Sequence, residues 1–482
     1  ALEAEARWCQ ATLPSEHPAL VVGLLRRLFA EVGPLFTRRM GDVVAQAGEG
    51  DARKPLGLLV QVRQALSQFL EQAELVLGVG AWGQELEMQQ ALYQPLLPQL
   101  HSYGELEQSH LAAELGALKL PDSTGAGSRS MDAKDRAVRA MAASVNSVAG
   151  SMEEAISRCQ AFTLGIEFPT LLAVLNSSLD QYISMLGASL DVLYVQFDCR
   201  PPADAGAPPQ PGGAAEAAEE VPSPGGLAQM AVGEDIGVAL GLVAVAKDVL
   251  QQVDLVDAQC RTALRSVQGK LASQQGDAPV LRRLLETRVA GLEQSIPQLT
   301  ASHASLLPRA TSGALAFISA VETFVLDVIL SPVRQALLGY GRLPLWGRVA
   351  QEADADLPTF SALPNQQVTD IGEYLLMLPE QLDVLAPASP AAGAGEGGGG
   401  LDAQDEAGAW VVKIAQAIAA DYGRCLLQVQ RLSAPGANQL VADLDYFCNI
   451  LQAILGDDIP AVLKTFQEGA AMAPEQLAAT AE

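Results

Sequence analysis

The sequence predicts an all-α fold built from consecutive helical bundles. Apolar residues recur at three- and four-residue steps along most of the 482 residues, which is the spacing of an amphipathic helix. Aromatic residues make up only 5% of the chain, and β-branched clusters bounded by two-residue turns, the usual mark of strands, are absent. Hydrophobic residues reach 49% and charged residues only 18%, so most of the chain is expected to fold.

The first predicted region, an N-terminal helical bundle region over residues 1–200, contains three clear apolar stripes. They are Leu56, Leu59, Val60, Leu66, Phe69, Leu70, Ala73, Val76 and Leu77; Val138, Met141, Val145, Val148, Met152 and Ile156; and Leu171, Leu175, Leu179, Ile183, Leu186, Leu190 and Leu193. Each helix is expected to bury its stripe against neighbouring helices, with residues such as Arg63 on the polar face.

Two segments poor in apolar residues divide the rest of the chain. Residues 201–226 hold seven Pro and five Gly and are expected to form a linker, because such a segment buries too little surface to offset the entropy of ordering. A middle helical bundle is predicted for residues 227–345 and a C-terminal helical bundle for residues 357–470. The C-terminal bundle contains a Gly-rich loop at residues 387–400, with six Gly and two Pro.

Charge and composition exclude several classes of protein. Lys and Arg total 30 against 56 Asp and Glu, a formal net charge of −26, which argues against binding nucleic acid. The longest uncharged apolar runs are about a dozen residues, short of the roughly 20 that a membrane-spanning helix needs. Six widely spaced cysteines favour a reducing compartment, the cytosol. The N-terminus has neither an initiator Met nor signal-peptide features, so we expect a fragment of a longer chain or an incomplete gene model, with sequence missing ahead of Ala1.

A glycine pattern at Gly78, Gly80 and Gly83 is the first candidate for chemistry. The same spacing occurs in dinucleotide-binding turns, where missing side chains let a pyrophosphate approach a helix N-terminus. That motif must follow a buried strand, whereas the preceding residues carry Glu71 and Glu74 at helical spacing. The glycines are therefore interpreted as a helix break.

Three acidic pairs are the next candidates, and each has a structural explanation. Asp443 and Asp445 resemble a metal-binding Asp-x-Asp pair, but on a helix they point about 200° apart and do not share one ion. The pair Asp354 and Asp356 precedes Pro358 and is interpreted as an exposed acidic turn. The pair Asp457 and Asp458 lacks the further Asp of isoprenoid enzymes, since Ala461 stands there.

Other residue types give no catalytic, cofactor or metal site. The four histidines, His17, His101, His110 and His303, are not spaced to hold zinc together. No nucleophile elbow and no phosphate-binding loop is present. Asn176 and Ser178 form a glycosylation sequon inside an amphipathic helix, which favours a structural role. Paired arginines at 26–27, 38–39 and 282–283 could at most meet an anionic partner surface.

Four long segments in a fixed order resemble a known family. They cover residues 159–186, 305–338, 357–385 and 438–454. The resemblance is carried by Phe162, Thr163, Leu164, Gly165, Ile166 and 168–172 in the first; by Leu357, Pro358, Phe360, Ser361, Ile371, Gly372, Tyr374, Leu378, Pro379 and Leu382 in the third; and by Gln439, Leu440, Asp443, Asp445 and Tyr446 in the fourth. The chain is similar to subunit seven of the conserved oligomeric Golgi complex, with low-complexity insertions at 201–226 and 387–400 and a weaker match over the first 150 residues.

The resemblance implies an elongated rod of helical bundles and a non-catalytic function. Such a subunit belongs to a tethering complex that captures intra-Golgi retrograde vesicles and maintains glycosylation enzymes. It would pair with subunit five, in one lobe with subunits six and eight, and the complex binds small GTPases and fusion proteins. The implied location is the cytosolic face of Golgi membranes, with peripheral membrane contact through partners, and no cofactor. The family's N-terminal helical region is expected to be missing ahead of Ala1.

Two other classes stay open at the level of sequence. A subunit of an exocyst-like tether would share the architecture of stacked helical bundles, and an all-α metal-dependent enzyme is the alternative from a different class. The partner-binding faces are not identified by the sequence. One candidate is the stripe Leu440, Leu444, Phe447 and Leu451, for which the competing interpretation is that it forms the core of the C-terminal bundle.

Overall fold

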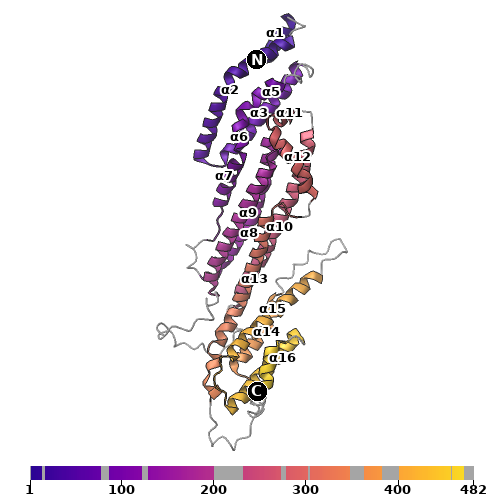
Figure 1. Ribbon diagram of the computed structural model, residues 1–482. Helices are drawn as coiled ribbons and strands as arrows, with labels where there is room; N and C mark the ends of the chain where they lie inside the picture. The colour runs from indigo at the N-terminus through magenta and orange to yellow at the C-terminus, as the bar shows by residue number, and fades with distance from the viewer. Residues whose placement is uncertain are drawn as a thin grey trace, which may run out of the picture. The chain divides into compact units, whose positions relative to one another are not determined.

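A computed structural model describes residues 2–12, 17–77, 86–121, 129–199, 232–272, 278–301, 304–347, 363–382, 401–456 and 459–471. Every regular element within these ranges is a helix (Figure 1), so the predicted all-α fold class is confirmed. The linker at 201–226 and the loop at 387–400 lie outside the described residues.

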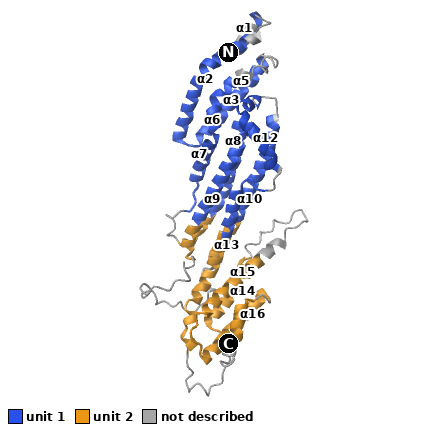
Figure 2. Ribbon diagram, viewed as in Figure 1, with its two compact units in different colours: residues 1–122, 139–189, 245–319 blue, residues 123–138, 190–244, 320–482 orange. Residues whose placement is uncertain are grey.

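The chain forms two compact units, each assembled from segments far apart in sequence (Figure 2). Unit 1 comprises residues 1–122, 139–189 and 245–319, and unit 2 comprises residues 123–138, 190–244 and 320–482. The sequential boundaries expected from composition stay a prediction.

Unit 1 begins with helices that follow one another along the chain. They are α1 (Leu2–Thr12), α2 (His17–Gly50), α3 (Lys54–Leu77), α5 (Leu86–Tyr93), the short 3₁₀ helix η1 (Gln94–Leu96), α6 (Leu97–His101) and α7 (Tyr103–Gly116). Parts of α8 (Met131–Thr163), α9 (Phe168–Phe197), α10 (Val232–Ala272) and α13 (Pro308–Leu337), together with α11 (Ala278–Leu284) and α12 (Glu286–Ala301), complete it.

The predicted apolar stripes are confirmed in α8 and α9, where every stripe residue is buried. In α3 the stripe divides between buried residues such as Leu56 and Leu59 and half-buried residues such as Leu66. The predicted position of Arg63 on the polar face was wrong, because its side chain is buried. Its guanidinium donates to the Ala161 carbonyl, so the stem lies against apolar side chains while the charged end reaches an acceptor.

Unit 2 contains the remaining parts of the shared helices and the C-terminal elements. These elements are η3 (Tyr340–Arg342), η4 (Pro344–Gly347), α14 (Gln366–Leu382), α15 (Leu401–Leu426), α16 (Ala434–Leu455) and α17 (Ala461–Ala471). Helix α16 contacts α14, α15, α17 and η4. The side chains of the stripe are buried in this bundle: Leu440, Leu444, Phe447 and Leu451. The prediction that the stripe is a docking face was therefore wrong, and the interpretation that it forms the core is confirmed.

Two segments pass a test of length and apolar composition for crossing a membrane. They are Gly233–Leu271 in α10 and Pro308–Gly347, which contains α13. Half of the most apolar window of each is already buried in the protein, and core helices pass the same test. These helices contain no long uncharged run, because occasional charged residues interrupt their apolar windows. The expectation of no spanning helix stays a prediction.

Candidate functional site

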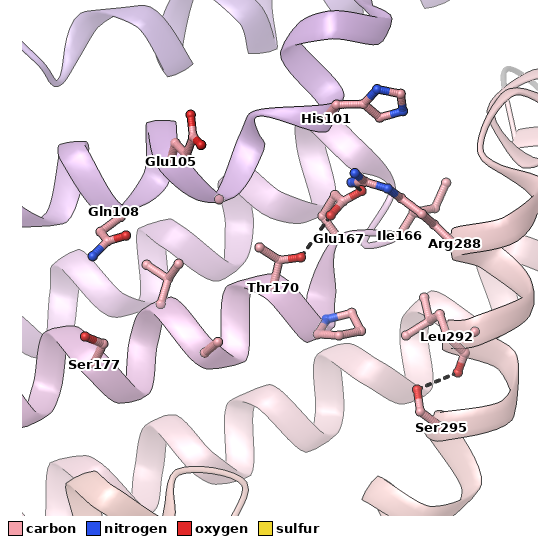
Figure 3. Close-up of a pocket in the computed structure, with 15 residues that line it drawn as sticks. His101, Glu105, Gln108, Ile166, Glu167, Thr170, Ser177, Arg288, Leu292 and Ser295 are labelled. Carbon is pink, nitrogen blue, oxygen red and sulfur yellow. Dashed lines mark hydrogen bonds and ion pairs between the residues drawn. The ribbon is translucent and has the colours of Figure 1, made fainter.

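A groove of about 810 Å³ in unit 1 is the candidate binding site (Figure 3). It is lined by the end of α6 and the start of α7, by the first turns of α9 and by α12. Its lining includes the small residues Gly104, Ala173 and Gly291. A Cβ atom at Gly104 would lie 2.5 Å from Cγ2 of Thr170, so the absence of a side chain lets α7 approach α9 closely.

The turn between α8 and α9 positions the acidic group of the groove. Leu164 and Gly165 both adopt positive φ, at 55° and 83°, a conformation that glycine tolerates best. A side chain at Gly165 would also overlap Val267. The Thr163 hydroxyl closes the turn by donating to the Cys159 carbonyl at 2.7 Å and accepting from the Gly165 amide at 3.2 Å. This turn belongs to the first segment of the family resemblance, residues 159–186, and it places Glu167 immediately before α9.

The carboxylate of Glu167 is buried but not free to react. Arg288 extends from α12 toward it in Figure 3 and pairs with Oε1, while the Thr170 hydroxyl donates to Oε2 at 3.0 Å. Because both of its oxygens already accept from neighbouring side chains, this carboxylate is poorly placed to take a proton from a substrate as a general base. The Thr170 hydroxyl beside this carboxylate is itself engaged in holding it, and the ion pair with Arg288 joins the start of α9 to α12.

A second carboxylate of unit 1, Glu107 on α7, is fully buried. Arg158 on α8 donates to Oε1 from Nη2 at 2.5 Å and from Nε at 3.2 Å, and the Tyr103 hydroxyl donates to Oε2 at 3.1 Å. Burial raises the pKa of Tyr103 well above its usual value and lowers the pKa of the nearby His110. This closed cluster joins helices rather than receiving a ligand.

Unit 2 holds a third buried carboxylate, Asp443 on α16, which is satisfied by neutral donors. The Tyr340 hydroxyl donates to Oδ2 at 2.6 Å, and the Asn365 amide and the Gln439 side chain donate to Oδ1 at 2.6 and 2.8 Å. The hydroxyls of Tyr340 and Tyr422 lie 2.9 Å apart. Burial raises the pKa of Asp443, and the three hydrogen bonds partly oppose that shift. Burial also raises the pKa of both tyrosines.

Of the three acidic pairs in the sequence, the structure describes Asp443 and Asp445. Asp443 and Asp445 lie on a helix as predicted, and they have separate partners, because Asp445 accepts from Gln467 at 2.6 Å. The pairs Asp354, Asp356 and Asp457, Asp458 lie outside the described residues, as do Gly78, Gly80 and Gly83. The segment before those glycines is helical up to Leu77, as expected.

The histidines occupy unrelated positions in the described part of the chain. His101 lines the groove and His110 is buried, whereas His303 and the side chain of His17 lie outside the description. Within the described ranges no three His, Cys, Asp or Glu side chains gather as a metal site would require. The prediction that the chain has no catalytic, cofactor or metal site stays a prediction.

Two structural roles were not visible in the sequence patterns. Asn176 accepts from the amides of Arg309 and Ala310, each at 3.1 Å, and so satisfies the first turn of α13. The pair of Glu167 and Arg288 joins residues 121 positions apart. A signal for Glu167 was its place between Ile166 and Phe168, since a charge inside a buried apolar segment needs a partner.

Comparisons with known proteins give consistent matches. The family model described as Golgi complex component 7 (COG7) matches residues 1–284 and 282–482. Conserved oligomeric Golgi complex subunit 7 of Arabidopsis thaliana is 28% identical over 521 residues, covering 97% of this chain and 61% of the relative. The Bos taurus and Homo sapiens proteins of the same name are each 22% identical, over 94% and 93% of this chain. The chain spans about three fifths of the length of these curated relatives.

Proposed function

The chain belongs to the Golgi complex component 7 family, and we propose that it acts as a non-catalytic subunit of the conserved oligomeric Golgi tethering complex. The match of the family model along the chain carries this proposal. The complex would capture intra-Golgi retrograde vesicles and so maintain the glycosylation enzymes of the Golgi. The chain would work at the cytosolic face of Golgi membranes, held there peripherally through its partners.

The proposed partners are other subunits of the complex, with subunits five, six and eight as the nearest neighbours, together with small GTPases and fusion proteins. The described fold suits this role, because helical bundles offer long faces and grooves to partner helices. The buried carboxylates also suit a non-catalytic role, since Glu107 and Glu167 are each engaged by an arginine that joins two helices. No observation favours the exocyst-like alternative or a metal-dependent enzyme.

The experiment that tests the proposal is affinity purification of the tagged full-length protein from its own cells, with the bound chains identified by mass spectrometry. The expected result is recovery of the other Golgi-complex subunits in near-equal amounts. Recovery of the protein alone, or with the subunits of another tether, would contradict the proposal.

The groove is the surface at which we expect one of these subunits to dock. Ser177 on α9 lines the groove and is exposed, so Ser177→Arg fills it without disturbing the core. Ser184→Arg provides the matched control, since Ser184 is an exposed serine two turns further along α9 that does not line the groove. Loss of a subunit with Ser177→Arg but not with Ser184→Arg supports the groove as a docking site. Equal recovery with both variants counts against it.

A further inference from the structure

The imidazole ring of His110 on α7 is enclosed in the core of unit 1. Only 8% of the residue is exposed, although Glu105 and Gln108 of the same helix line the groove. Within the described part of the chain, the ring atom Nδ1 has no hydrogen-bond partner. A charged ring donates from both nitrogens, so protonation would bury a cationic N–H that nothing accepts. Burying such a charge costs more than burying a neutral polar atom.

The carboxylates beside this ring are already paired with arginines. Glu107 and Glu114, both on α7, act on the ring electrostatically, as does Arg158 of α8. The backbone of Arg53, just before α3, also faces the ring. Arg158 donates to Glu107 at 2.5 Å. Arg53 binds Glu114 at 3.4 Å and Asp51 at 2.9 Å. Neither glutamate can therefore accept from a charged ring without giving up its arginine.

The arginines around the ring are engaged in other contacts as well. Arg158 also lies 3.4 Å from Glu154 on α8, and Arg63 of α3 donates to the Ala161 carbonyl. A proton on His110 would place a further cation in this cluster without a counterion of its own. Repulsion from Arg158 and the loss of hydration would then favour a state in which the ring reaches water.

We propose that His110 is a pH-sensitive switch: α7 stays packed beside α3 and α8 while the ring is neutral, and it loosens when the ring is protonated. Burial, followed by the charge of Arg158, holds the pKa of His110 below its usual value of 6.5. The loosened or unfolded state therefore binds a proton more readily than the packed state, so the packing of α7 loses stability as pH falls through 6.5. Because α7 forms one wall of the groove, acid would loosen that wall. The inference rests on the surroundings of the ring and not on the proposed function.

The test is amide hydrogen exchange of the purified chain, measured by mass spectrometry at about pH 7.5 and about pH 5.5, one unit on each side of 6.5. After correction for the intrinsic effect of pH, exchange in α7 is expected to be faster at the lower pH by as much as about tenfold. His110→Gln stays neutral at both pH values and should remove this acceleration. His101→Gln is the matched control, because His101 is an exposed histidine that lines the groove, and this variant should keep the acceleration.

A second measurement on the unmodified chain keeps the proposal testable if His110→Gln does not fold. Hydrogen exchange at the imidazole carbon between the two nitrogens, followed by mass spectrometry as pH is varied, reports the titration of each histidine separately. His110 should titrate below 6.5. Titration at 6.5 or above, absence of any acid-induced acceleration in α7, or acceleration that persists in a folded His110→Gln variant overturns the proposal. Recovery of the other subunits tests the proposed function separately.

Discussion

The two units stabilise their buried carboxylates in different ways. In unit 1, Glu107 and Glu167 are each paired with an arginine from another helix. In unit 2, Asp443 is equally buried but receives its hydrogen bonds from Tyr340, the Asn365 amide and Gln439. A guanidinium neutralises a buried charge, whereas neutral donors only solvate it. The two units should therefore respond differently to substitution and to pH.

The largest effect is expected for Arg158→Met. This change leaves the charge of Glu107 buried without its cation, and breaking such a pair costs about 3–5 kcal/mol. Urea denaturation of the purified chain measures the loss in free energy of unfolding. Arg282→Met is the control, since Arg282 and Glu293 form an exposed pair, and it should cost less than about 1 kcal/mol. A similar small loss for Arg158→Met would show that Glu107 does not depend on its arginine.

The second effect compares the removal of one negative charge from each unit. Glu107→Gln leaves Arg158 largely buried without its main partner, whereas Asp443→Asn leaves no unpaired cation behind. Glu107→Gln is therefore expected to cost at least about 2 kcal/mol more than Asp443→Asn. The same urea titrations measure both variants, and equal losses would remove the proposed distinction between the units.

A smaller effect is expected at the groove. Glu167→Gln removes the partner of Arg288, but the Arg288 side chain is 38% exposed and can be solvated. The expected loss is about 1 kcal/mol, less than at Glu107, because water screens the remaining charge. Thermal denaturation of this variant beside Glu107→Gln measures the ranking. A larger loss at Glu167 would indicate that the groove is closed to water.

The smallest effect is a dependence of stability on pH that arises from Asp443. Burial raises its pKa in the folded protein above its usual value of 3.8. The folded state then holds the proton more tightly than the unfolded state, so this group stabilises the fold below pH 3.8 and loses that contribution as pH rises through the folded pKa. Urea denaturation from the acid range to neutrality should show the unmodified chain losing stability relative to Asp443→Asn. A constant difference would show that the three hydrogen bonds fully offset burial.

Much of the local structure could be predicted because its signal is local. The stripes of α8 and α9 have the helical period, and all their residues are buried. The long segments that carry the family resemblance likewise predicted the family that the comparisons show. Arg63 and Glu167 were missed because their partners, Ala161 and Arg288, lie far away in the sequence. No periodicity within one helix contains such a pairing.

Two stripes with the same pattern separate what the sequence determined from what the tertiary structure decided. By itself, the sequence determined that Leu440, Leu444 and Leu451 share one helix face, and that Leu24 and Leu28 share another, because residues four apart lie on the same side of a helix. Only the packed structure shows that the first face is core and the second is exposed. Periodicity specifies which side chains point together, but what covers them depends on helices distant in the chain.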